Sequence, residues 1–170
     1  MKIVMKPLQY IKDLRYLHTA VKLLQNLKET CHRLLRDIPN IRIGIIAHGD
    51  FCDNHNYVIK IQDLTSDVQK LVDFAAGTPA TGGGDTPECY ELVLQKAQQL
   101  DWTEDSAKAL VVIGDCEPHP PSYTDQKINW HDELNALKAM EVKAVAFGVE
   151  VYNIQIHKYV LTTNKKKPEE

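Results

Sequence analysis

Asp85 and Glu88 stand where three consecutive glycines meet the start of an amphipathic run. The stretch reads Ala80-Thr-Gly-Gly-Gly-Asp-Thr-Pro-Glu-Cys89. Glycine allows a ligand to approach the backbone closely, and proline is favoured just inside a helix start. Carboxylate and hydroxyl oxygens grouped in this way suit a hard cation such as Mg²⁺. Because Asp85 lies three residues before Glu88, the same spacing also fits a helix-capping pair. The stretch therefore predicts either a metal site or a capped helix N-terminus.

Two further segments carry side chains that could do chemistry. Asp115 directly follows the apolar run Ala109–Ile113, and Glu117 and His119 come soon after it as possible acid/base groups. His119 lies among prolines, so we expect it to be an exposed loop residue. The second segment follows the apolar run Ile41–Ala47 and groups side chains that could bind zinc or iron: His48, Asp50, Cys52, Asp53 and His55.

Composition and charge restrict the range of functions. The chain has 170 residues and a formal charge of −3, so it is long enough for one ordinary domain with a core, and its charge does not favour nucleic acid or anionic membranes. No C-x-x-C pair occurs among the four cysteines, which argues against a zinc knuckle or a disulfide framework. We expect reduced thiols, no signal peptide, no transmembrane span and, by default, a cytoplasmic protein.

Apolar spacing of three and four residues predicts helices in four places. The longest stripe runs from Leu8 to Ile38 and ends at Pro39. Thr65-Ser-Asp67 is expected to cap the next helix, which Gly77 and Pro79 end. The remaining two helices follow the glycine stretch to about Leu100 and include Trp130, Leu134, Leu137 and Met140.

Short apolar runs between these helices predict strands. They are Ile41–Ala47, Tyr57–Ile61, Ala109–Ile113 and Val142–Val149, with a brief run at Ile3–Met5 and an ambiguous one at Tyr152–Val160. Strands that alternate with helices predict an α/β fold with three layers and a mainly parallel sheet. Since ligands in such sheets bind beyond the carboxyl ends of the strands, we expect Asp85, Glu88 and Asp115 to act together at that edge.

Four segments together resemble a von Willebrand factor A domain, over about two thirds of the chain: Ile41–Asp53, Thr81–Leu94, Ala109–His119 and Trp130–Val149. The stretch Gly-Gly-Gly-Asp-Thr-Pro-Glu is similar to the D-x-P-E loop of integrin β-subunit I-like and hemicentin-type domains. The resemblance implies a three-layer, Rossmann-like fold with one antiparallel strand near Tyr57–Ile61. It also implies that Glu88 and Asp115 belong to a metal-ion-dependent adhesion site and that Asp85 serves a neighbouring cation.

The chain departs from this family at both ends. The family's D-x-S-x-S motif occurs nowhere in the sequence, so two hydroxyls and one carboxylate of the adhesion site are missing. The last helix and strand of the family also find no clear match after Val149. We therefore expect a single A-like domain over residues 1–160 with a divergent helical segment at 1–40, followed by a flexible tail at 161–170. If Ile3–Met5 does not fill the centre of the sheet, exposed strand edges predict marginal stability or dimerisation.

The resemblance implies a function that is not enzymatic. We expect a protein-interaction or adhesion-type module whose partial metal site, built from Asp85, Glu88 and Asp115, binds Mg²⁺ or Mn²⁺ and, through it, an acidic side chain of a protein partner. Two alternatives remain open. One is a small metal-dependent hydrolase that uses Asp115, His119 and His48. The other is an A domain that has lost its metal and serves as a scaffold.

Overall fold

The computed structural model describes residues 2–5, 14–53, 56–79, 81, 87–114, 116–149 and 156–160. Its strands are β1 (Lys2–Met5), β2 (Ile43–His48), β3 (Ile59–Thr65), β4 (Lys108–Gly114), β5 (Val142–Val149) and β6 (Ile156–Val160). Its helices are α1 (Leu14–Asp37), α2 (Val68–Ala76), α3 (Tyr90–Gln98) and α4 (Trp130–Ala139), with a 3₁₀ turn, η1, at Phe51–Asp53. The predicted mixed α/β class is confirmed.

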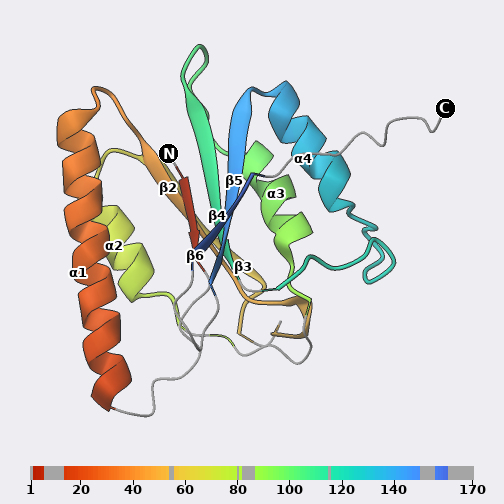
Figure 1. Cartoon of the computed structure of the whole chain (residues 1–170), viewed down its shortest axis with the longest axis horizontal. Coiled ribbons are helices and arrows are strands. Elements are labelled where there is room, and N and C mark those ends of the chain that lie inside the picture. Colours follow the sequence, from red (N-terminus) through yellow and green to blue (C-terminus); the bar gives the residue numbers. More distant parts are fainter. Residues whose placement is uncertain are drawn as a thin grey trace.

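The described strands form one six-stranded sheet in the order β3-β2-β1-β4-β5-β6 (Figure 1). The four inner strands run parallel to one another. Both edge strands, β3 and β6, run antiparallel to their neighbours. The antiparallel strand expected near Tyr57–Ile61 is thus present, although it begins at Ile59 and extends to Thr65. Because the inner strands are parallel, the chain leaves β2 and β4 at the same edge of the sheet.

β1 occupies the centre of the sheet. Ile3 lies opposite Ile45 of β2 on one side and opposite Val111 of β4 on the other. The brief apolar run at the start of the chain therefore fills the central position, and the condition on which we expected exposed edges beside β2 and β4 is not met. Four residues were too few for the sequence alone to decide this point.

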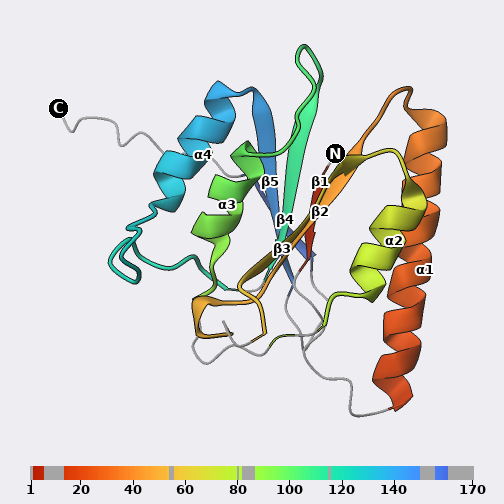
Figure 2. The same ribbon diagram turned by 180° about the vertical axis from the view of Figure 1, so that it is seen from behind.

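Helices cover both faces of the sheet (Figures 1 and 2). On one face, α1 and α2 contribute Leu27, Cys31 and Leu71 to a buried cluster with Ile43 and Ile45 of β2. On the other face, α3 and α4 form a larger cluster whose buried members include Val93, Leu110, Leu134 and Leu137. Ile46, the next residue after Ile45, belongs to this second cluster. Since successive side chains of a strand point to opposite faces, β2 is buried from both sides, which explains its uninterrupted apolar sequence.

Polar side chains cap the first turns of α2 and α4. The side chain of Asp67 accepts hydrogen bonds from the backbone N–H groups of Gln69 and Lys70, and α2 ends where Gly77 follows it. Asn129 accepts from His131 at the start of α4 in the same way. These contacts satisfy N–H groups that have no partner within the helix. α1 is described from Leu14 to Asp37, within the stripe that predicted it, and residues 8–13 of that stripe lie outside the described residues.

Glu88 does not lie in the first turn of α3, as the predicted capping pair requires, and Asp85 lies outside the described residues. α3 begins at Tyr90, its N-cap residue is Cys89, and that side chain makes no capping hydrogen bond. Pro87 and Glu88 therefore precede the helix instead of opening it. The backbone N–H of Glu88 donates to the carbonyl of Glu117 at 2.9 Å, in a short parallel bridge between Glu88 and Pro118. This pairing keeps residue 88 extended and delays the helix.

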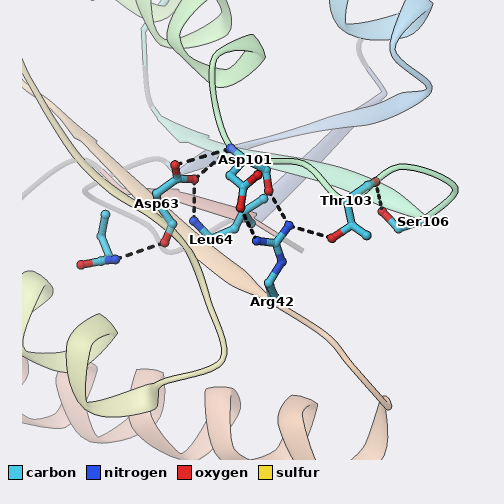
Figure 3. A network of polar contacts seen from close by, with 7 residues as sticks. Arg42, Asp63, Leu64, Asp101, Thr103 and Ser106 are labelled. Atoms are coloured by element: carbon cyan, nitrogen blue, oxygen red, sulfur yellow. Dashed lines mark hydrogen bonds and ion pairs between the residues drawn. The ribbon is translucent and has the colours of Figure 1, made fainter.

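A polar network lies at the edge of the sheet where β2 begins (Figure 3). Arg42, just before β2, forms an ion pair with Asp101 at 2.7 Å and donates to the hydroxyl of Thr103 at 2.7 Å and to the backbone carbonyl of Asp101. Asp63 of β3 accepts from the backbone N–H of Asp101 at 3.2 Å. The network thereby ties β2 and β3 to the loop between α3 and β4. It lies at the far end of β2 from His48.

No helix within the described ranges combines the length and the apolar character needed to cross a membrane.

Candidate functional site

Glu88 is the one predicted metal ligand whose position the structure describes, because Asp85 and Asp115 lie outside the described residues. Its side chain is 3% exposed and sits at the carboxyl edge of the sheet. One carboxylate oxygen lies 3.9 Å from Nδ1 of His48, the last residue of β2. Its backbone is tied to Glu117, which follows β4. Glu88 therefore lies where β2 and β4 end, at the edge of the sheet where we expected the predicted ligands.

The loop that leaves β2 passes very close to its neighbours at Gly49. A Cβ atom at this position would lie 2.7 Å from the carbonyl oxygen of Tyr57 and 2.9 Å from the hydroxyl oxygen of Thr81. The backbone N–H of Gly49 donates to Val58 at 2.9 Å, and its carbonyl oxygen accepts from the thiol of Cys89 at 3.1 Å. Only glycine leaves room for this approach. These contacts place the loop after β2 directly against the start of α3.

His119 and Asp50 form a buried pair. Nε2 of His119 lies 2.6 Å from Oδ1 of Asp50, and the two side chains are 1% and 0% exposed. The thiol of Cys52 donates to the other carboxylate oxygen of Asp50 at 3.1 Å. The expectation that His119 is an exposed loop residue is therefore wrong. Its prolines do lie in a loop, but a carboxylate 69 residues earlier in the chain draws the ring into the interior.

Two aromatic rings cover the His119 side chain. Tyr123 stacks on it with ring centroids 3.7 Å apart, and Phe51 lies at 5.5 Å on a tilted plane. Tyr123 is itself 41% exposed, so it shields the histidine from solvent at the surface. Within the described part of the chain, Nδ1 of His119 has no hydrogen-bond partner. The pair therefore sits in a low-dielectric setting where its hydrogen bond is strong.

Glu91 is a second buried carboxylate, in the first turn of α3. Its side chain is 3% exposed, and one oxygen accepts the backbone N–H of His119 at 3.1 Å. Burial raises the pKa of the Glu91 carboxyl above its ordinary value, although the hydrogen bonds and the nearby His119 oppose this shift. The folded protein therefore binds the Glu91 proton more tightly than the unfolded chain does. Sequence spacing missed this residue, because Glu91 falls beside the apolar stripe of its helix.

Glu91→Gln is expected to raise the melting temperature at pH 8. The raised pKa means that wild type loses stability as the pH rises from the unfolded carboxyl value of about 4.3 through the folded value. Glutamine keeps an oxygen that can accept the His119 N–H but carries no charge to bury. The gain should thus be largest above the folded pKa and vanish near pH 4. Thermal unfolding between pH 4 and 8 measures it, with the exposed Glu104→Gln as control. A variant less stable than wild type at pH 8 would contradict the prediction.

Cys89 is unsuited to nucleophilic chemistry. Its thiol is fully buried and donates to the Gly49 carbonyl at 3.1 Å. Burial raises its pKa far above the ordinary value, and the negative charges of Glu91, Asp50 and Glu88 raise it further. The reactive form of cysteine is the thiolate, which this setting disfavours. Burial also raises the pKa of the Cys31 thiol.

In the native protein, iodoacetamide should label Cys52 at least about 100-fold faster than Cys31 or Cys89. Cys52 is exposed, whereas the other two are fully buried. A time course read by peptide mass spectrometry gives the three rates in one sample, and the same course in denaturant should make them equal. Labelling of native Cys89 at the rate of Cys52 would contradict this picture of the site.

The described residues do not form a metal site by themselves. Within the described ranges, no set of three or more histidine, cysteine, aspartate or glutamate side chains is arranged to hold an ion. The described members of the predicted zinc or iron group after β2 contact different partners. Asp50 is engaged with His119 and Cys52, His48 lies against Glu88, and His55 falls outside the described residues. Glu88 offers the oxygen donor that Mg²⁺ or Mn²⁺ prefers, and a complete set would need Asp85 and Asp115.

Comparison with known proteins gives one distant relative. No family model matches the chain. The chain is 29% identical over 118 residues to "Putative ariadne-like RING finger protein R811" of Acanthamoeba polyphaga mimivirus. The match covers 67% of this chain but 11% of the viral protein. The chain is thus similar to a short segment of a much longer protein.

Proposed function

We propose that this chain is a non-enzymatic protein-interaction domain of the von Willebrand factor A type. The strand arrangement carries the proposal: a central β1, the order β3-β2-β1-β4-β5-β6, and an antiparallel edge strand at β3. Helices on both faces of this sheet support the three-layer, Rossmann-like form that the resemblance implies. In such sheets the order reverses beside the first strand, and ligands bind in the crevice at the carboxyl ends there. Glu88 lies at that edge.

The metal in this proposal is Mg²⁺ or Mn²⁺. Glu88 and Asp115 would hold the ion, Asp85 would assist, and a carboxylate of the partner would complete its shell. Residues 6–19, which follow β1, contain only Asp13 and Thr19 among aspartate, glutamate, serine and threonine, and their spacing does not fit D-x-S-x-S. The site would accordingly have fewer protein ligands than the family pattern, and we expect weak binding with several waters retained.

The buried histidines argue against the hydrolase alternative. That reading needs His48 and His119 to reach a substrate, yet their side chains are 0% and 1% exposed. Nε2 of His119 is also engaged with Asp50. A general base must lie within hydrogen-bond reach of the proton that it removes. The geometry of these two residues therefore argues against their acting as general bases.

The viral relative suggests a setting for the domain. RING fingers hold zinc through closely spaced cysteine and histidine ligands, whereas the cysteines here are Cys31, Cys52, Cys89 and Cys116. The shared 118 residues would then correspond to a part of the viral protein outside its RING finger. On this reading, a domain similar to this chain occurs as one part of a larger protein.

Calorimetric titration with Mg²⁺ and Mn²⁺ tests the proposal. Wild type should show saturable binding that Glu88→Ala/Asp115→Ala abolishes. The control Glu104→Ala/Asp132→Ala removes two charges from exposed positions and should bind as wild type does. Absence of binding by wild type up to about 10 mM metal would remove the ion from the proposal and leave a metal-free scaffold. Turnover of a nitrophenyl ester or phosphate that Asp115→Ala abolishes would replace the proposal with a hydrolase.

A further inference from the structure

Three contacts from separate elements converge on residues 116–119, the segment that follows position 115 in the chain. The ring of His119 bonds to Asp50, in the loop after β2. The backbone N–H of His119 donates to the carboxylate of Glu91 in α3. The carbonyl of Glu117 accepts the backbone N–H of Glu88, just ahead of α3. The segment is therefore fixed against both β2 and α3.

The pair of Asp50 and His119 dominates this arrangement. It is the one contact of the three that joins two side chains, both almost fully buried, and its 2.6 Å separation is that of a strong hydrogen bond. Its geometry sets where the His119 backbone lies, and the His119 N–H in turn meets Glu91. Glu117 is two residues earlier and carries the carbonyl that holds Glu88. A shift of the His119 ring would thus move the backbone of residues 117–119, which contacts Glu88.

We infer that Asp50 and His119 are positioning residues for the carboxyl edge of the sheet. Their buried contact holds residues 116–119 against the start of α3, where Glu117 meets Glu88. This inference rests on the proposed function, in which Glu88 and Asp115 share an ion. Neither Asp50 nor His119 binds the ion. They act through the backbone that carries the ligands, as residues behind metal ligands commonly do.

Amide hydrogen exchange tests the positioning role without any metal. In Asp50→Asn/His119→Leu the contact is lost but no charge is stranded, so folding is less at risk than in either alanine variant. The amides of Glu88 and His119 should exchange at least about tenfold faster, relative to amides of β2 and β4, than in wild type. Asp50→Asn alone keeps an oxygen for the histidine and should give about a threefold increase. It decides the question if the double variant does not fold.

Two comparisons separate positioning from general destabilisation. Arg42→Ala weakens the network at the other end of β2, so it should change exchange at Glu88 and His119 by no more than at β2 and β4. His119→Gln retains a side-chain N–H donor for Asp50 and should restore most of the protection at Glu88. Equal exchange changes at all sites in the Asp50 and His119 variants, or the same local pattern in Arg42→Ala, would overturn the inference.

Measuring the Mn²⁺ affinity of the same variants tests whether the pair of Asp50 and His119 supports the proposed metal site. Asp50→Asn/His119→Leu should bind Mn²⁺ at least about tenfold more weakly than wild type, whereas Arg42→Ala should bind it as wild type does. A wild-type protein that binds no Mn²⁺ would defeat the metal part of the proposed function, and the exchange data would still decide the positioning role. A wild type that binds Mn²⁺, with unchanged affinity in the double variant, would overturn the link between the pair and the site.

Discussion

Asp50→Ala and His119→Ala should each lower the free energy of unfolding by about 3–5 kcal/mol. Both side chains are almost completely buried, and their polar atoms lie 2.6 Å apart. Removing either one leaves the other in an apolar environment without its main partner. His119→Ala also removes the ring on which Tyr123 stacks at 3.7 Å, an interaction of about 0.5–1.5 kcal/mol beyond simple burial. The loss should therefore be at the upper end of the range for His119→Ala.

A double-mutant cycle by urea unfolding measures the coupling. Asp50→Ala/His119→Ala should lose clearly less stability than the sum of the two single variants, because the double variant strands no partner. The exposed pair of Arg36 and Asp37, at 2.7 Å, provides a control of similar distance but different burial. Arg36→Ala should cost no more than about 1 kcal/mol. Additive losses for Asp50 and His119, or losses as small as that of Arg36→Ala, would contradict the buried pair.

Gly114→Ala should lower stability by about 1–3 kcal/mol. A Cβ atom at Gly114, the last residue of β4, would clash with the side chain of Tyr90. It would lie 1.9 Å from the hydroxyl oxygen of Tyr90 and 2.5 Å from the ring carbon that carries this oxygen. Tyr90 cannot simply turn aside, because it is 7% exposed and its ring packs edge-on against His48 at 5.0 Å. The substitution must therefore push the first turn of α3 away from β4. That movement would also shift Glu88, which lies two residues before Tyr90.

Thermal unfolding and Mn²⁺ titration of Gly114→Ala measure both consequences. Gly77→Ala is the matched control, since Gly77 has ordinary backbone angles at the end of α2 and its nearest contact for a Cβ is 3.1 Å. That variant should stay within about 0.5 kcal/mol of wild type. Wild-type stability in Gly114→Ala would mean that Tyr90 is free to move, and the close approach of α3 to β4 would then not matter.

The fold was largely predictable because its signals are local. Apolar runs of five to eight residues mark β2, β4 and β5, and spacing of three and four marks α2 and α4, each within a few residues of the observed bounds. β1 was the exception. Its four residues form no pattern of their own, and β2 and β4 on either side determine its place in the sheet.

The position of Glu88 was predictable, but the contacts around it were not. Strand ends and the glycine stretch correctly brought Glu88 to the edge where β2 and β4 finish. The pairing of His119 with Asp50 could not be read from spacing, since these residues are 69 positions apart and neither belongs to a helix or strand. The place predicted for Glu88 in the first turn of α3 was wrong for a similar reason. A long-range backbone bond to Glu117 competes with the helical conformation that local residues favour.

A crystal structure of the protein grown with Mn²⁺ tests the central claim most directly, because the anomalous signal of the ion locates it. The account predicts a peak at the carboxyl edge of the sheet, about 2.1–2.2 Å from oxygens of Glu88 and Asp115, with water completing the shell. A structure in which Asp85, Glu88 and Asp115 bind no ion at millimolar Mn²⁺, and Glu88 stays against His48, would contradict the claim of a metal-dependent interaction site.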